Sequence, residues 1–164
     1  SRHGIPARFL ALEVTESGLL SDLDNARIQL AQLADVNIAV AIDDFGTGHS
    51  SLAYVKTLPF STLKIDRAFV MDLEKDAVDR HLALTITQLA HAVGCDVVAE
   101  GIEGPRQAER LRALGCDLGQ GYLWSRPMEP EAIEELLDGL SGKTYGVTTL
   151  GCDHCQATLL PFHL

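Results

Sequence analysis

The sequence predicts an α/β fold in which a parallel sheet is covered by helices. Short apolar segments alternate along the chain with longer segments whose apolar residues recur at helical spacing. The apolar run at residues 38–42 is short and does not alternate with polar residues, as is typical of a parallel strand buried on both faces. At 164 residues with 46% hydrophobic content, the chain is large enough for one domain with a substantial core.

Five segments are expected to form strands, and helical patterns follow them along the chain. The expected strands are residues 9–14, 38–43, 62–66, 96–99 and 118–124. The expected helices are one that begins at Ser21 or Asp22, a short one at 51–57, and three at 76–93, 105–114 and 129–140. Gly94 and Gly115 are typical helix stops, and Pro105 suits a first helical position.

Polar residues gather where the expected strands end. They are Glu13, Asp43, Asp44, Lys64, Glu100 and Gln120. A doubly wound sheet concentrates its site at one switch point, whereas a barrel uses the ends of many strands, so the distribution favours a (β/α) barrel of the TIM type. Such a barrel has eight strands in about 250 residues. Residues 1–140 are therefore expected to form only its later five strand–helix units, and residues 141–164 a flexible C-terminal tail.

Two adjacent acids, Asp43 and Asp44, follow the apolar run and precede a glycine-rich segment, Gly46-Thr47-Gly48. Adjacent carboxylates repel each other unless a cation or a shared proton intervenes. Magnesium and manganese favour such hard oxygen ligands. The alternative is a plain turn, since Asp and Gly are common turn residues, but a turn does not need two acids at a strand end.

The other polar residues each have a structural alternative. Glu13 would then be a solvated acid at a strand end, and Glu16 an acid favoured by the dipole of a helix start. Lys64 would pair with Asp66, which alternation places on the same face of the strand, and Gln120 would belong to a turn.

Net charge and cysteine content indicate which ligands and which cell compartment to expect. The net charge of −10 argues against binding to a nucleic-acid polymer, although bound cations would still allow a small phosphorylated ligand. Cys95 and Cys116 each precede an expected strand and are interpreted as small buried residues of a reducing compartment. We therefore expect a cytoplasmic domain, either free or as the cytoplasmic part of a membrane-anchored signalling protein.

Five motifs in order resemble the EAL domain family. They are Leu12-Glu13-Val14-Thr15-Glu16, the stretch from Asp43-Asp44-Phe45-Gly46 to Leu52, Leu63-Lys64-Ile65-Asp66, Val98-Ala99-Glu100-Gly101-Ile102-Glu103 and Gly119-Gln120-Gly121-Tyr122, with Arg126-Pro127 after them. The resemblance implies a barrel that hydrolyses the bacterial second messenger cyclic di-GMP to linear pGpG with two Mg²⁺ or Mn²⁺ ions. It also implies a homodimer and an attached diguanylate cyclase or sensory domain.

The resemblance assigns roles residue by residue. Metal ligands are Glu13, Asp43 as the bridging carboxylate, Asp44 and Glu100, while Lys64 and Gln120 hold the attacking water. Glu100 is also a candidate general base. Glu16 anchors the loop after Asp44, and Gln120 and Asp66 are candidates for substrate binding. The family's Glu-Ala-Leu motif and an asparagine ligand lie on earlier strands, so we expect residues 1–164 alone to bind metal poorly.

Two questions stay open in the sequence. A domain that senses cyclic di-GMP without hydrolysing it, or an interaction segment without a ligand, would share most of these motifs. Such degenerate relatives usually lose the paired aspartates, the lysine or the late glutamate, all of which are present here. In the tail, Cys152, His154 and Cys155, with His163 as a distant fourth ligand, would suit zinc; a flexible tail without metal is the alternative.

Overall fold

The computed structural model describes residues 6–47, 52–139, 149–152, 155–158 and 162–163. Its strands are β1 (Ala11–Thr15), β2 (Ala39–Phe45), β3 (Thr62–Ile65), β4 (Asp96–Ala99), β5 (Leu118–Gly119), β6 (Thr149–Cys152), β7 (Cys155–Thr158) and β8 (Phe162–His163). Its helices are η1 (Ala7–Phe9), α1 (Glu16–Ser21), α2 (Leu23–Asp35), α3 (Leu52–Val55), α4 (Arg67–Met71), α5 (Ala77–Ala92), α6 (Pro105–Ala113) and α7 (Pro130–Gly139).

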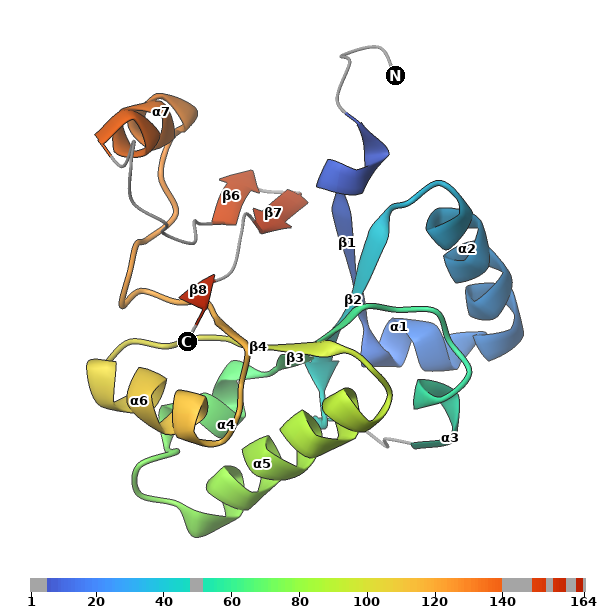
Figure 1. Cartoon of the computed structure of the whole chain (residues 1–164), viewed down its shortest axis with the longest axis horizontal. Coiled ribbons are helices and arrows are strands. Elements are labelled where there is room, and N and C mark those ends of the chain that lie inside the picture. Colours follow the sequence, from blue (N-terminus) through green and yellow to red (C-terminus); the bar gives the residue numbers. More distant parts are fainter. Residues whose placement is uncertain (1–5, 48–51, 140–148, 153–154, 159–161, 164) are drawn as a thin grey trace.

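Strands β1 to β5 form one parallel sheet in sequence order, as the alternation of strands and helices predicts. Helix α2 packs against β2, and α5 packs against β3 and β4 (Figure 1). The register pairs Val14 with Ile42, Leu63 with Val97 and Val98 with Leu118. Because neighbouring parallel strands are joined through helices, their C-terminal ends meet at one edge, which is where a barrel carries its site.

The core lies on the face of the sheet that the helices cover. Ile42, Leu63 and Ile65 are fully buried there, together with Leu30 of α2 and Ile86 of α5. Alternation along a strand places residues such as Lys64 on the opposite face of the sheet from Leu63 and Ile65.

Helix α5 buries most of its apolar stripe. Helical spacing predicts Leu82, Ile86, Leu89 and Val93 on the buried face. Ile86 is buried and Leu89 and Val93 are partly buried against the core, whereas Leu82 is 39% exposed. The other buried residues of α5 are Ala83, Thr87 and Ala90, whose small size lets the helix approach the sheet closely.

The last parallel strand is much shorter than the predicted residues 118–124. Strand β5 ends at Gly119, and the chain then turns around Ile102, whose N–H donates to Gln120 O at 3.1 Å and whose carbonyl accepts from Leu123 N at 2.9 Å. Apolar residues 122–124 therefore belong to a turn that wraps the loop after β4. Their composition alone did not distinguish this turn from a strand.

Two short helices were not predicted. Helix α1 begins directly after β1, where Thr15 Oγ1 accepts from Gly18 N at 3.2 Å. Helix α4 begins directly after β3, where Asp66 Oδ1 accepts from Ala68 N at 2.8 Å. Each is too short to show a helical period, so only its N-cap residue could have indicated it.

The tail contains described strands. Strands β6 and β7 pair antiparallel, and β8 pairs antiparallel with β5. The expected tail flexibility stays a prediction. The zinc site that we considered cannot be assessed as a whole, because His154 lies outside the described residues. In the part of the chain that the structure describes, no helix is long and apolar enough to cross a membrane.

Candidate active site

Lys64, on β3, is the centre of the site. Its Nζ lies 2.7 Å from Glu13 Oε2, 3.2 Å from Asp43 Oδ1 and 2.5 Å from Glu100 Oε1. The three acids come from β1, from β2 and from the residue after β4. Together with Lys64 on β3, residues from four neighbouring strands therefore converge. The Lys64 side chain is 2% exposed. The structure thus brings together four of the residues that the sequence singled out.

Charge in this cluster is strongly coupled. Burial lowers the pKa of Lys64, but the carboxylates of Glu100 and Glu13 outweigh burial and hold its pKa above the ordinary 10.5. Burial raises the pKa of the Glu100 carboxyl; Lys64 opposes this effect, and the charges of Asp43 and Glu13 add to it. The ammonium therefore stays charged at neutral pH, whereas Glu100 holds a proton more readily than an exposed glutamate does.

Asp44 occupies a strained position beside a second acid. Its φ is 55°, a left-handed conformation that Asp tolerates better than most residues, and the register of β2 against β3 shifts between Ile42 and Phe45. Partial burial raises the pKa of Asp44, and the carboxylates of Asp43 and Asp66 raise it further. These neighbouring acids favour either a proton or a bound cation on Asp44.

Asp66 and Gln120 are placed at the same edge by backbone contacts. Asp66 follows β3 and caps α4, so the alternative in which Asp66 pairs with Lys64 is not what the structure contains. Gln120 follows β5, and its N–H donates to Ala99 O at 2.8 Å. This bond sets Gln120 next to the strand end that carries Glu100.

Glu16 holds the segment that follows Asp44. It is 2% exposed, its Oε2 accepts from Gly46 N at 3.1 Å, and its Oε1 accepts from the Tyr54 hydroxyl at 2.7 Å. Gly46 adopts a φ of 94°, which favours glycine. One carboxylate of α1 therefore ties the end of β2 to α3.

The carboxylate oxygens of this site are chemically suited to bind a divalent cation. Carboxylate oxygens are the hard ligands that Mg²⁺ and Mn²⁺ prefer. Three of them, from Glu13, Asp43 and Glu100, already converge on one cationic atom, the Lys64 Nζ. No three His, Cys, Asp or Glu side chains within the described ranges are arranged to hold an ion as they stand. A bound ion would therefore compete with the Lys64 ammonium for the same oxygens.

Sequence reasoning missed two residues that hold this site. Tyr54 donates to Glu16, and the Gln107 side chain contacts backbone groups of α4 and of the loop after β4. Gln107 is the third residue of α6, a position where Gln commonly returns to the helix N-terminus. That position was a usable signal, whereas nothing local identifies the partner of Tyr54, which lies 38 residues away.

The EAL domain model matches residues 1–127. The chain belongs to the EAL domain family. It is 46% identical over 134 residues to a cyclic di-GMP phosphodiesterase, NbdA, of Pseudomonas aeruginosa, a match that covers 82% of this chain and 17% of NbdA. It is 44% identical to the bifunctional diguanylate cyclase/cyclic di-GMP phosphodiesterase MucR of the same species, over 80% of this chain and 19% of MucR.

Comparison with solved structures also identifies the EAL family, and it shows that the fold is part of a TIM-type barrel. A PaMucR phosphodiesterase in complex with c-di-GMP is 44% identical with a TM-score of 0.78, over 80% of this chain and 53% of that one. Klebsiella pneumoniae BlrP1 in a manganese/cy-diGMP complex is 30% identical with a TM-score of 0.71, over 76% of this chain and 32% of that one. The chain thus spans about half of the PaMucR domain and about a fifth of the curated relatives.

Proposed function

We propose that the intact domain containing this chain hydrolyses cyclic di-GMP to linear pGpG with two divalent ions, Mg²⁺ or Mn²⁺. The observation that carries the proposal is the convergence of Glu13, Asp43 and Glu100 on a buried lysine at the C-terminal edge of the sheet. The relatives named as cyclic di-GMP phosphodiesterases support the substrate. The manganese complex of BlrP1 supports a divalent ion.

Four carboxylates at the strand ends would bind the two ions. Glu13, Asp44 and Glu100 would each contribute oxygens, and Asp43, to which the family resemblance gives the bridging role, would be shared by both ions. Ions bound there would make a water more acidic and offset charge on the phosphodiester. In the hydrolysis, the water oxygen bonds to phosphorus and gives up a proton to the general base. The phosphorus–oxygen bond to one sugar breaks, and the sugar oxygen takes up a proton, which opens the ring.

Lys64, Gln120 and Glu100 act on the water. Lys64 donates from a buried ammonium that is charged at neutral pH, which orients the water and offsets the negative charge that grows on the phosphate. Gln120, at the next strand end, would hold the water or the substrate, and Asp66 would contact the substrate. Glu100, which contacts the Lys64 ammonium, is also the candidate general base for this water.

The wider assembly follows from the family. We propose that the intact protein is a homodimer in which the loop held by Glu16 contributes contacts. An attached diguanylate cyclase or sensory domain is supported by the bifunctional relative MucR. A cytoplasmic location is supported by the thiols of Cys95 and Cys116, which are buried and not in disulfides. The proposed barrel domain is 1–140, and segment 141–164 follows it as a tail, within which β8 pairs with β5 of the sheet.

The test is the exchange of Asp43 for Asn in an intact EAL domain that contains this chain. Asp43→Asn is expected to abolish hydrolysis of cyclic di-GMP in Mn²⁺, because a shared carboxylate is lost from both ions. Asp35→Asn makes the same change on the exposed end of α2 and serves as the control. Turnover near wild type in Asp43→Asn would contradict the two-ion assignment. Wild-type protein that binds cyclic di-GMP without hydrolysing it would instead be a sensor.

A further inference from the structure

The loop that carries Glu100 is held between two neighbouring elements. Glu100 N donates to Ile65 O on β3 at 3.1 Å, and Ile102 N donates to Gln120 O at 3.1 Å. These bonds fix the first half of the loop by extending the pattern of the sheet. The second half, at Glu103 and Gly104, has left the sheet and depends on other contacts.

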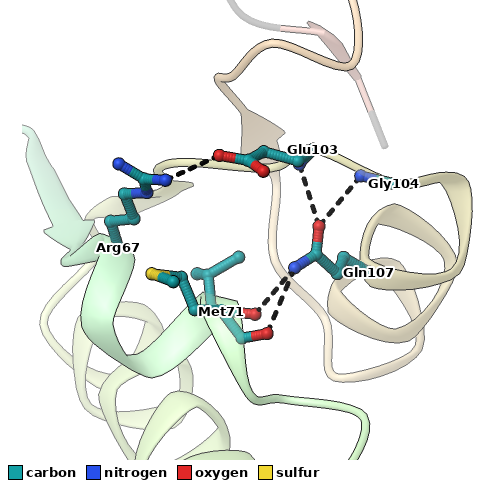
Figure 2. Close-up of polar contacts among 6 residues, drawn as sticks. Arg67, Met71, Glu103, Gly104 and Gln107 are labelled. Atoms are coloured by element: carbon teal, nitrogen blue, oxygen red, sulfur yellow. Dashed lines mark hydrogen bonds and ion pairs between the residues drawn. The ribbon is translucent and has the colours of Figure 1, made fainter.

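Gln107 supplies these contacts with both ends of its side-chain amide. Its Oε1 accepts from Glu103 N at 2.8 Å and from Gly104 N at 2.9 Å. Its Nε2 donates to Val70 O at 3.1 Å and to Met71 O at 3.5 Å, at the C-terminal end of α4 (Figure 2). One side chain therefore joins the loop after β4 to the helix after β3.

A second contact runs across the same junction but is weaker. The Arg67 Nη2 lies 2.7 Å from Glu103 Oε1 (Figure 2). These two side chains are 53% and 50% exposed. Surface ion pairs of this exposure contribute little to stability. Gly101 has a φ of 69°, and a side chain there would meet that of Arg67, so the loop and α4 pack closely. The partly buried amide of Gln107 is the stronger tether.

We propose that Gln107 is a positioning residue for Glu100. By fixing the loop against α4, it sets Glu100 relative to Lys64, because β3 leads directly into α4 and β4 leads directly into the loop. This inference rests on the proposed function, in which Glu100 is a metal ligand. Partners that orient a metal ligand typically change metal affinity or activity by about 10–100-fold when they are replaced.

Gln107 also has a simpler role, which is to cap α6. Its Oε1 satisfies backbone N–H groups at the start of that helix, and a glutamate would do so equally well with favourable charge at a helix N-terminus. Only the amide Nε2 can donate to the α4 carbonyls. Gln107→Glu therefore keeps the cap and replaces the tether by repulsion between oxygens, whereas Gln107→Ala removes both.

The experiment compares Gln107→Glu, Gln107→Ala and wild type in an intact EAL domain. Gln88→Glu, on the exposed face of α5, introduces the same charge as a control. Calorimetry measures the affinity for Mn²⁺, turnover of cyclic di-GMP gives kcat and KM, and thermal unfolding reports stability. Gln107→Glu is expected to stay folded, with a small drop in melting temperature from the lost bonds to α4 and with a wild-type KM. Its Mn²⁺ affinity and kcat should each fall by about 10-fold or more.

Wild-type Mn²⁺ affinity and kcat in Gln107→Glu would overturn the proposal and leave Gln107 as a helix cap. Loss of folding in both variants would overturn it as well, because the residue would then be needed for the fold. If the wild-type domain does not hydrolyse cyclic di-GMP, the proposed function fails. The Mn²⁺ affinities still test the positioning role in that case, because they do not depend on turnover.

Discussion

At the scale of single residues, Lys64 explains how the acids of the site coexist in one small volume. Glu13, Asp43 and Glu100 surround its ammonium at 2.7, 3.2 and 2.5 Å. Without a cation at this point, like charges would repel one another. The positive charge of Lys64 therefore has two roles. It balances the carboxylates in the metal-free domain, and it lets the ammonium donate to the water in the proposed reaction.

Replacing Lys64 by Met removes the charge and keeps most of the volume. The free energy of unfolding of the metal-free domain is expected to fall by about 3–5 kcal/mol, the range for removing one partner of a buried ion pair. Urea denaturation measures this change. Lys75→Met is the control, because Lys75 is 86% exposed and 3.9 Å from Asp72. A loss no larger than that of Lys75→Met would show that the carboxylates do not need the ammonium.

The contribution of Lys64 also has a defined pH window. Because its folded-state pKa lies above the ordinary 10.5, the stabilisation is fully present below that value and is lost as pH rises through the folded-state pKa. The difference between wild type and Lys64→Met should thus be constant through mildly alkaline pH. Adding Mn²⁺ should reduce this stability difference between wild type and Lys64→Met, since the ion binds the same carboxylates in the folded state.

At the scale of elements, the bond between Tyr54 and Glu16 joins α3 to α1. Both side chains are 2% exposed. Burial and the Glu16 carboxylate raise the pKa of Tyr54, so the phenol stays protonated and can donate at any physiological pH. Since Glu16 also accepts from Gly46 N, α3 and the turn after Asp44 depend on the same carboxylate.

Tyr54→Phe removes only the hydroxyl. It leaves a buried carboxylate oxygen without this donor, which is expected to cost about 1–3 kcal/mol of unfolding free energy. Tyr122→Phe removes the same group from a side chain that is 51% exposed, and it should change stability little. Thermal or urea unfolding of the two variants gives the comparison. Equal stability of both would show that Glu16 does not rely on Tyr54 to hold α3.

The sequence predicted those elements that have a period or a strong composition. The runs that became β2, β3 and β4 were identified because they are apolar and end in polar residues, and α5 and α6 because they are long or clearly capped. The acids around Lys64 were identified as candidate site residues because they stand at the ends of expected strands. The role of Gln107 at the start of α6 could have been predicted from its position. The contacts of Tyr54 with Glu16 and of Gln107 with α4 were not predictable, because these partners are distant along the chain and become neighbours only through the fold.

At the scale of the whole molecule, the described sheet is open. Its strand order is β1-β2-β3-β4-β5-β8, so β1 pairs with β2 on one side only among the described strands. Phe9, Leu10 and Leu12, in and just before β1, are 65%, 46% and 43% exposed. An unpaired strand edge beside apolar side chains is a site of association between chains. The PaMucR domain, of which this chain matches 53%, has further chain available to cover such an edge.

A polypeptide of residues 1–164 alone is therefore expected to associate, to bind Mn²⁺ weakly and not to hydrolyse cyclic di-GMP. A (β/α) barrel closes through eight strands, whereas the described sheet has five parallel strands and stays open, so this polypeptide would lack part of the wall around the site. Light scattering and hydrolysis in Mn²⁺ would be compared with an intact domain. Within the 164-residue chain, Leu12→Lys should reduce association, because a charge protects a strand edge. A monodisperse, active 164-residue monomer would show that five strands suffice for the site.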